Sequence, residues 1–170
     1  LVIATPKSML RNKLAVSMPD EFTGGRWHPA MGDPTITDPS KVERVVICSG
    51  KTRWELYAAR EQLGLQETVA ILTLERLYPL PAKELAAELD KYRHVRDIRY
   101  AQDEPSNQGA WWFMKLYLAD AIRKHLPDYD LVMTPVTRPE ASAPSVGSHK
   151  LHEEQQAILL KAALLGPEDA

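Results

Sequence analysis

The chain has 170 residues, 44% hydrophobic and 26% charged, a composition typical of a soluble globular protein. Its net charge of −2 gives no electrostatic reason to expect a nucleic acid or an anionic membrane as a partner, and no apolar run is long enough to span a bilayer. Cys48 is the only cysteine, which excludes an internal disulfide; within the apolar run Val45–Cys48 it is predicted to be a buried core residue.

The first 41 residues are predicted to be the end of a preceding domain followed by a linker. Leu1–Thr5 is a short β-rich apolar run that stops at Pro6. A lone strand needs a neighbour to pair with, so we expect this run to be the last strand of the preceding domain. The irregular stretch 17–41 is expected to pack along that domain, with Phe22 and Trp27 as its anchors.

From residue 42 onward, apolar strands alternate with amphipathic helices. Short, continuous apolar runs predict strands buried on both faces, and apolar residues at helical spacing predict the segments between them. The expected strands are 44–49, 69–74, 97–101 and 131–136, and the expected helices are 54–63, 82–92, 109–125 and 150–165. Four alternations predict that residues 42–170 form an α/β domain of three layers, with a mainly parallel sheet flanked by helices and right-handed crossovers.

The stretch 101–112 is the most informative turn of this domain. Two acidic residues, Asp103 and Glu104, end the third expected strand, and Pro105 is predicted to stop it because proline cannot donate to a strand ladder. Ser106 or Asn107 is then expected to cap the following helix through its side-chain oxygen.

The helix that follows begins with two adjacent indoles, Trp111 and Trp112, which cannot both face inward. One is expected to pack on the sheet and the other to meet a neighbouring domain or subunit. Together with Asp103 and Glu104, these tryptophans are the candidate interface residues.

Charged residues follow each expected strand, at the edge where ligands of open α/β sheets collect. Lys51, Arg76 and Arg138 are the candidate partners for a phosphate or carboxylate effector. The alternative is that these cations form ion pairs that brace loops or a domain interface. Both possibilities stay open at this stage.

Searches for catalytic motifs find little. Ser49-Gly50-Lys51 resembles the end of a phosphate loop, but Val45 stands where that motif needs a glycine. His149 and His152 are three residues apart with no obvious third metal ligand. The sequence therefore predicts no catalytic, cofactor-binding or metal-binding residue.

Several stretches in the same order resemble one known family. Asp103-Glu-Pro-Ser-Asn-Gln-Gly-Ala-Trp111 is similar to the E-E-P-x-N-Q-G-A-W signature of the E1 component of 2-oxoglutarate dehydrogenase. The other similar stretches are Thr5–Arg11, Val46–Lys51, Leu74–Pro81, Arg138–Pro144 and the Gly147/His152/Gln155–Gln156 tail. Their order and spacing over nearly the whole chain identify it as a member of this family, and imply a fold like the C-terminal domain of transketolase.

The resemblance implies a parent enzyme of the tricarboxylic acid cycle that decarboxylates 2-oxoglutarate on thiamine diphosphate with Mg²⁺. It then passes the succinyl group to a lipoyl arm of the dihydrolipoyl succinyltransferase E2 component. The implied partners are the rest of the E1 chain, a second E1 subunit and E2. The implied location is the cytoplasm of a bacterium or the mitochondrial matrix of a eukaryote.

In the family, the diphosphate, metal and catalytic histidine positions lie upstream of Leu1. The fragment is therefore expected to be inactive alone and to serve assembly, support of the active-site domains and regulation. An actinobacterial branch of the family has an acetyl-CoA activator site near Arg76, Lys83 and Glu84, but the charge of Glu84 would oppose a phosphate. A close relative acting on 2-oxoadipate would share the same motifs.

The alternative is a free-standing α/β module that binds a nucleotide-like anion at Lys51, Arg76 and Arg138. Such a module would be a stable monomer whose anion affinity is lost on Arg138→Ala.

Overall fold

The computed structural model describes residues 1–166, and it confirms the predicted α/β domain with a mainly parallel sheet between helices. The expected domain 42–170 includes residues 167–170, which lie outside the described residues. The strands are β1 Ala30–Met31, β2 Arg44–Cys48, β3 Val69–Leu74, β4 Asp97–Pro105 and β5 Thr134–Arg138. The helices are α1 Pro19–Thr23, α2 Thr52–Leu63, α3 Ala82–Leu89, α4 Trp111–Arg123 and α5 His149–Leu164, and short 3-10 turns occupy Lys7–Met9, Pro39–Lys41 and Asp90–Tyr92. None of the helices in this part of the chain is long and apolar enough to cross a membrane.

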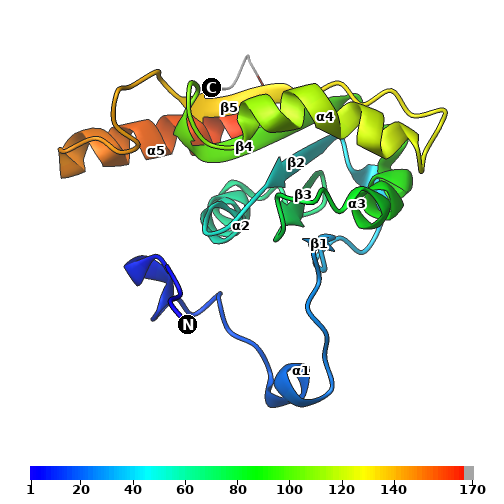
Figure 1. The fold of residues 1–170 in the computed structure, drawn as a ribbon, viewed down its shortest axis with the longest axis horizontal. Coiled ribbons are helices and arrows are strands. Elements are labelled where there is room, and N and C mark those ends of the chain that lie inside the picture. Colours follow the sequence, from blue (N-terminus) through cyan, green and yellow to red (C-terminus); the bar gives the residue numbers. More distant parts are fainter. Residues whose placement is uncertain (167–170) are drawn as a thin grey trace.

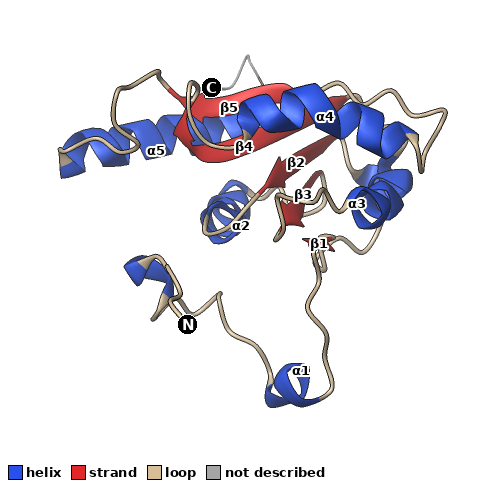
Figure 2. Ribbon diagram, in the orientation of Figure 1, coloured by secondary structure: helices blue, strands red, loops and turns tan. Residues whose placement is uncertain are grey.

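The sheet has the order β1-β3-β2-β4-β5 (Figures 1 and 2). β2 lies at the centre and pairs in parallel with β3 and with β4, and β4 pairs in parallel with β5. β1 pairs antiparallel with β3 through two residues only, Ala30 opposite Leu74 and Met31 opposite Thr73. All six residues of β3 are buried, which explains why its continuous apolar sequence predicted it to the residue.

Two apolar clusters hold the helices to the two faces of the sheet. Alternate side chains of β2 point to opposite faces, so that Val45 and Ile47 join the cluster under α3 and α4, whereas Val46 and Cys48 join the one under α2 and α5. Burial confirms Cys48 as a core residue and raises the pKa of its thiol to about 12, so it stays protonated at neutral pH.

Three strand predictions need correction. β4 continues through Pro105, which lies opposite Arg138 of β5 beyond an irregularity in the pairing. β5 runs over 134–138 rather than 131–136, because Leu131 is buried in the cluster under α4 and pairing with β4 begins only at Thr134. The fifth strand, β1, lies in the stretch that was expected to be a linker.

The segment before β1 extends away from the sheet as an arm, residues 1–29 (Figure 1). Residues 1–6 form no strand and are exposed; no neighbouring strand pairs with them in residues 1–166. The expected anchors Phe22 and Trp27 are 79% and 62% exposed. That this arm packs on another domain stays a prediction.

Candidate functional site

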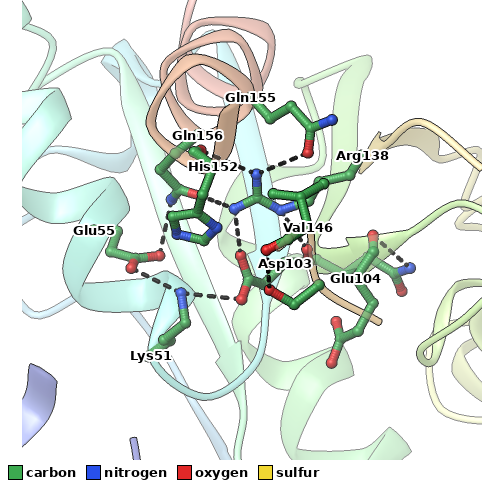
Figure 3. A network of polar contacts seen from close by, with 11 residues as sticks. Lys51, Glu55, Asp103, Glu104, Arg138, Val146, His152, Gln155 and Gln156 are labelled. Carbon is green, nitrogen blue, oxygen red and sulfur yellow. Dashed lines mark hydrogen bonds and ion pairs between the residues drawn. The ribbon is translucent and has the colours of Figure 1, made fainter. Parts of the chain in front are cut away.

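The carboxyl end of the sheet holds a closed ring of five polar side chains (Figure 3). They are Lys51 at the turn after β2, Glu55 of α2, Asp103 of β4, Arg138 of β5 and Gln156 of α5. We call this group the polar ring. It joins two helices to three strands, including the central one, at the edge where the sequence predicted charged residues to collect.

The contacts run around the ring without a gap. Lys51 Nζ lies 2.8 Å from Glu55 Oε1 and 3.1 Å from Asp103 Oδ2. Arg138 Nη2 lies 2.8 Å from Asp103 Oδ1 and also donates to Gln156 Oε1. Gln156 Nε2 donates to Glu55 Oε2 at 2.9 Å, which closes the ring. Two positive and two negative charges therefore neutralise each other.

Arg138 is the most buried member of the polar ring, at 5% exposure. Besides its ring partners, its Nε donates to the backbone oxygen of Asp103 at 2.8 Å. Its Nη1 reaches the backbone oxygen of His152 at 3.4 Å and Gln155 Oε1 at 3.5 Å. A guanidinium has five N–H donors, and those of Arg138 point at protein oxygens.

The ring also sets the protonation of its own members. Burial opposes ionisation of Asp103, but the hydrogen bond from Arg138 and the charge of Lys51 outweigh it, and the pKa of the carboxyl is lowered. Burial likewise opposes the charge on Lys51, but the hydrogen bond and charge of Glu55, with Asp103, outweigh it and raise the pKa of the ammonium. Both groups are thus held in their charged forms.

The start of α4 depends on a residue that the sequence did not single out. Gln102, 3% exposed, accepts a hydrogen bond from the Trp111 N–H through Oε1 at 2.8 Å. Its Nε2 donates to the backbone oxygen of Gln108 at 2.8 Å. The predicted capping by Ser106 or Asn107 is wrong: the Asn107 side chain instead exchanges hydrogen bonds with Ala141, at 3.0 and 3.2 Å, and holds the loop after β5.

The structure separates the three predicted anion partners. Lys51 and Arg138 belong to the polar ring, where Asp103 lies between them. Arg76 takes no part in that ring: its Nε donates to the backbone oxygen of Pro79 at 2.8 Å and its guanidinium lies 5.8 Å from the ring centre of Trp27.

The predicted interface residues have different surroundings. Trp111 is 5% exposed and packs against Tyr100, whereas Trp112 is 50% exposed. The Trp112 indole N–H donates to the backbone oxygen of Ser106 at 2.9 Å. Glu104 is exposed at the rim, whereas Asp103 is engaged by the polar ring.

Two ring members, Glu55 and Gln156, were missed by sequence reasoning. Glu55 stands four residues after Lys51, a spacing at which oppositely charged side chains meet on a helix, so a local signal existed. Gln156 carries no such signal, because its partners lie 18 and 101 residues away in the chain.

The arrangement around the ring is suited to bracing rather than to chemistry. A cavity of about 170 Å³ opens beside Arg138, between Gln155 and the loop after β5. Ligand pockets usually enclose roughly 300–1,000 Å³. In residues 1–166 there is also no group of three His, Cys, Asp or Glu side chains placed to hold a metal ion. His149 lies 3.4 Å from Glu153, and His152 contributes only its backbone oxygen to Arg138.

Comparison with known proteins identifies relatives over almost the whole chain. A 2-oxoglutarate dehydrogenase E1 component from Cupriavidus necator is 42% identical over 163 residues, which are 96% of this chain and 16% of the relative. The corresponding protein of Azotobacter vinelandii is 37% identical, over 96% of this chain and 17% of the relative. A multifunctional 2-oxoglutarate metabolism enzyme of a Mycobacterium species is 43% identical, over 95% of this chain and 13% of the relative.

The chain thus spans about a sixth or less of the length of these relatives. Among solved structures, a chain described as a split gene transketolase, inactive β4 tetramer, is similar with a TM-score of 0.49 and 13% identity, over 82% of this chain and 43% of that one. Residues 16–164 match the family described as the 2-oxoglutarate dehydrogenase C-terminal region. The motifs along the sequence, the identity to E1 components and this match agree, and the chain belongs to the 2-oxoglutarate dehydrogenase C-terminal family.

Proposed function

We propose that this chain is the C-terminal domain of a thiamine-diphosphate-dependent 2-oxoglutarate dehydrogenase E1 polypeptide, and that it serves assembly and support rather than the chemical step. The observation that carries the proposal is the 42% identity to an E1 component, extending over 96% of this chain but only 16% of the relative. This segment matches only a small part of an enzyme, and the side chains of its polar ring bind one another. Both features suit a structural role.

The described residues do not fit thiamine diphosphate and Mg²⁺. Residues 1–166 offer no cluster of metal-binding side chains, and Lys51 and Arg138, the cations best placed for a diphosphate, already hold Asp103. We therefore place the cofactor in the part of the E1 polypeptide outside this chain. Decarboxylation of 2-oxoglutarate and succinyl transfer to the lipoyl arm of the E2 component would also occur there.

Residues 1–41 would comprise the end of the preceding domain and a linker, and residues 42–170 the C-terminal domain. The last part of that linker, from β1 onward, is joined to the sheet through β3. The arm exposes large apolar side chains that a neighbouring domain would cover: Leu1, Val2, Ile3, Leu10, Leu14, Val16, Met18, Phe22 and Trp27. Trp112 and Glu104 would meet a neighbouring domain or the second subunit of an E1 homodimer.

The anion-binding role of Lys51, Arg76 and Arg138 stays a prediction and is less well supported by the geometry. It requires an effector to displace Asp103 from two cations at once. If the domain is a free-standing effector module, titration with a nucleotide should show binding that Arg138→Ala abolishes.

The experiment that tests the proposal measures the size and activity of the native protein. An antibody raised against this domain should capture from source cells, bacterial cytoplasm or mitochondrial matrix, a polypeptide several times longer than 170 residues. The same fraction should decarboxylate 2-oxoglutarate in a thiamine-diphosphate- and Mg²⁺-dependent manner, and a parallel assay with 2-oxoadipate tests the related substrate. A native product of about this chain's size, without that activity, would overturn the proposal.

A further inference from the structure

Arg53 is a buried arginine for which residues 1–166 offer no carboxylate partner. It lies in the first turn of α2 and is 8% exposed. The other buried arginines, Arg60, Arg99 and Arg138, each form an ion pair with an aspartate. Within residues 1–166, no acidic side chain lies within 4.0 Å of Arg53, and its Nε has no hydrogen-bond partner.

Besides a polar contact with the Tyr57 hydroxyl, the contacts that Arg53 makes are weak. Its Nη1 lies 3.6 Å from the sulfur of Met31, a poor acceptor. Its guanidinium lies 4.9 Å from the ring centre of Trp54 and 5.3 Å from that of Tyr57. Cation–π contacts stabilise a desolvated guanidinium by less than the cost of removing that ion from water. The burial of Arg53 is therefore only partly compensated.

A second buried arginine, Arg60, lies close to Arg53. Tyr57 lies between Arg53 and Arg60, whose guanidinium is 4.9 Å from the same ring, and Asp33 pairs with Arg60 alone. Glu75, which follows β3, is an acidic residue whose pKa is influenced by the charge of Arg53. Burial raises the pKa of this carboxyl, the charge of Arg53 acts in the opposite direction, and the two side chains form no ion pair.

Arg53 also lies where the arm joins the domain. Its contact with Met31 places it beside β1, whose first residue, Ala30, directly follows the arm. Under the proposed function, the arm tethers the preceding part of the E1 polypeptide to this edge of the sheet. Tethering raises the effective concentration of any acidic side chain presented there.

We propose that Arg53 is the receptor for an aspartate or glutamate side chain contributed by the part of the E1 polypeptide that precedes this domain. This inference rests on the proposed function. The incoming carboxylate supplies the partner that residues 1–166 do not provide. It fixes the edge formed by β1 and the start of α2 against the neighbouring domain.

The test uses the full-length polypeptide carrying Arg53→Lys, treated with a water-soluble carbodiimide. This reagent joins an amine to a carboxylate in direct contact and adds no spacer. Peptide mass spectrometry should identify a cross-link from position 53 to an acidic residue outside residues 1–170. Arg93→Lys is the matched control, because Arg93 is half exposed and pairs with Asp90, so its cross-link should stay within the domain. A cross-link from position 53 to Glu75 alone, or none, would overturn the proposal.

A second variant tests the charge of Arg53 separately, because lysine is shorter than arginine and does not reach as far. Arg53→Met preserves the packing on Trp54 and Tyr57 but removes the charge. It should lower the thermal midpoint of the full-length protein and leave that of the 170-residue chain unchanged or higher, because only the former has a carboxylate to lose. Equal destabilisation of both proteins would mean that Arg53 only packs. If the native protein proves no longer than this chain, the proposed function itself has failed.

Discussion

Asp33 and Arg60 form an ion pair that hydrogen-bonds the backbone of β3 beyond the point where β1 ends. Asp33 Oδ2 accepts the backbone N–H of Ile71 at 2.8 Å, and Arg60 Nη1 donates to the backbone oxygen of Val69 at 2.7 Å. Both backbone groups belong to β3, beyond the two residues that β1 covers. The two side chains thus satisfy an edge that a longer strand would otherwise protect.

We expect Asp33→Asn to lower the free energy of unfolding by about 3–5 kcal/mol, because it leaves the charge of Arg60 buried without a partner. Urea denaturation followed by circular dichroism measures this change. Glu67→Gln is the control: it breaks the exposed pair with Lys41, whose loss should cost less than about 1 kcal/mol. Similar values for the two variants would contradict the role assigned to Asp33.

The polar ring predicts a specific dependence of stability on pH. The pKa of Asp103 is lowered in the folded protein, so its stabilising effect is complete above the unfolded value, about 3.9, and is lost as the pH falls through the folded value. From about pH 5 downward, the wild type should therefore lose stability more steeply than Asp103→Asn. Denaturation at a series of pH values measures both slopes, and parallel curves would show that the ring does not depend on this carboxylate.

The C-terminus of α5 is held by arginines from the opposite end of the sheet. Arg99 Nη1 donates to the backbone oxygens of Ala162 and Leu165, and Arg44 Nη1 to that of Leu164. Asp97 pairs with both guanidiniums, at 2.9 and 2.7 Å. These cations satisfy carbonyls that have no partner within the helix and lie favourably in its dipole.

Arg99→Met should therefore destabilise the domain by about 2–4 kcal/mol, through the lost helix-terminus contacts and the unpaired carbonyls. Hydrogen exchange should accelerate most in the last turn of α5. Arg123→Met removes a half-exposed pair with Asp120 and should change stability by less than about 1 kcal/mol. Uniform acceleration over the whole domain would argue against a local effect.

Two glycines with positive φ should differ in their tolerance of alanine. Gly50 has φ of +60° and open space around a Cβ, so Gly50→Ala should cost about 1–2 kcal/mol from backbone strain alone. Gly109 has φ of +69°, and its Cβ would lie 2.8 Å from the amide of Gln102, so Gly109→Ala should cost more. Chemical denaturation of both variants makes the comparison, and tryptophan fluorescence would report displacement of Trp111.

The sequence predicted those parts of the fold that local patterns determine. β3 has an uninterrupted buried run and was predicted at 69–74, and α2 and α5 were predicted to within two residues of their ends. β1 was missed because two residues carry no periodic signal and are ordered by pairing with β3. The residue that accepts a hydrogen bond from the start of α4 was misassigned, because this acceptor, Gln102, precedes the helix by nine residues in the chain.

The sequence predicted that charged side chains gather at the carboxyl end of the sheet, and it left open whether the cations bind an anion or form ion pairs. Lys51, Asp103 and Arg138 do meet at the carboxyl end of the sheet, as parallel strands require. Whether such cations are free or paired depends on residues brought by other elements. Here Gln156 of α5 links Arg138 to Glu55, and no local sequence pattern predicts this connection.

The position of α5 also has a consequence for synthesis of the chain on the ribosome. Arg44 and its helical partner Leu164 are 120 residues apart, and the cluster around Val46, Cys48 and Leu56 is covered by Leu159, Ala163 and Leu164. Because synthesis starts at the N-terminus, β2 and α2 leave the ribosome and are exposed to solvent long before α5 is made. One face of the nascent sheet therefore exposes apolar side chains until residues 159–164 have been synthesised. We expect a chaperone that binds apolar surface to act on the chain during that interval.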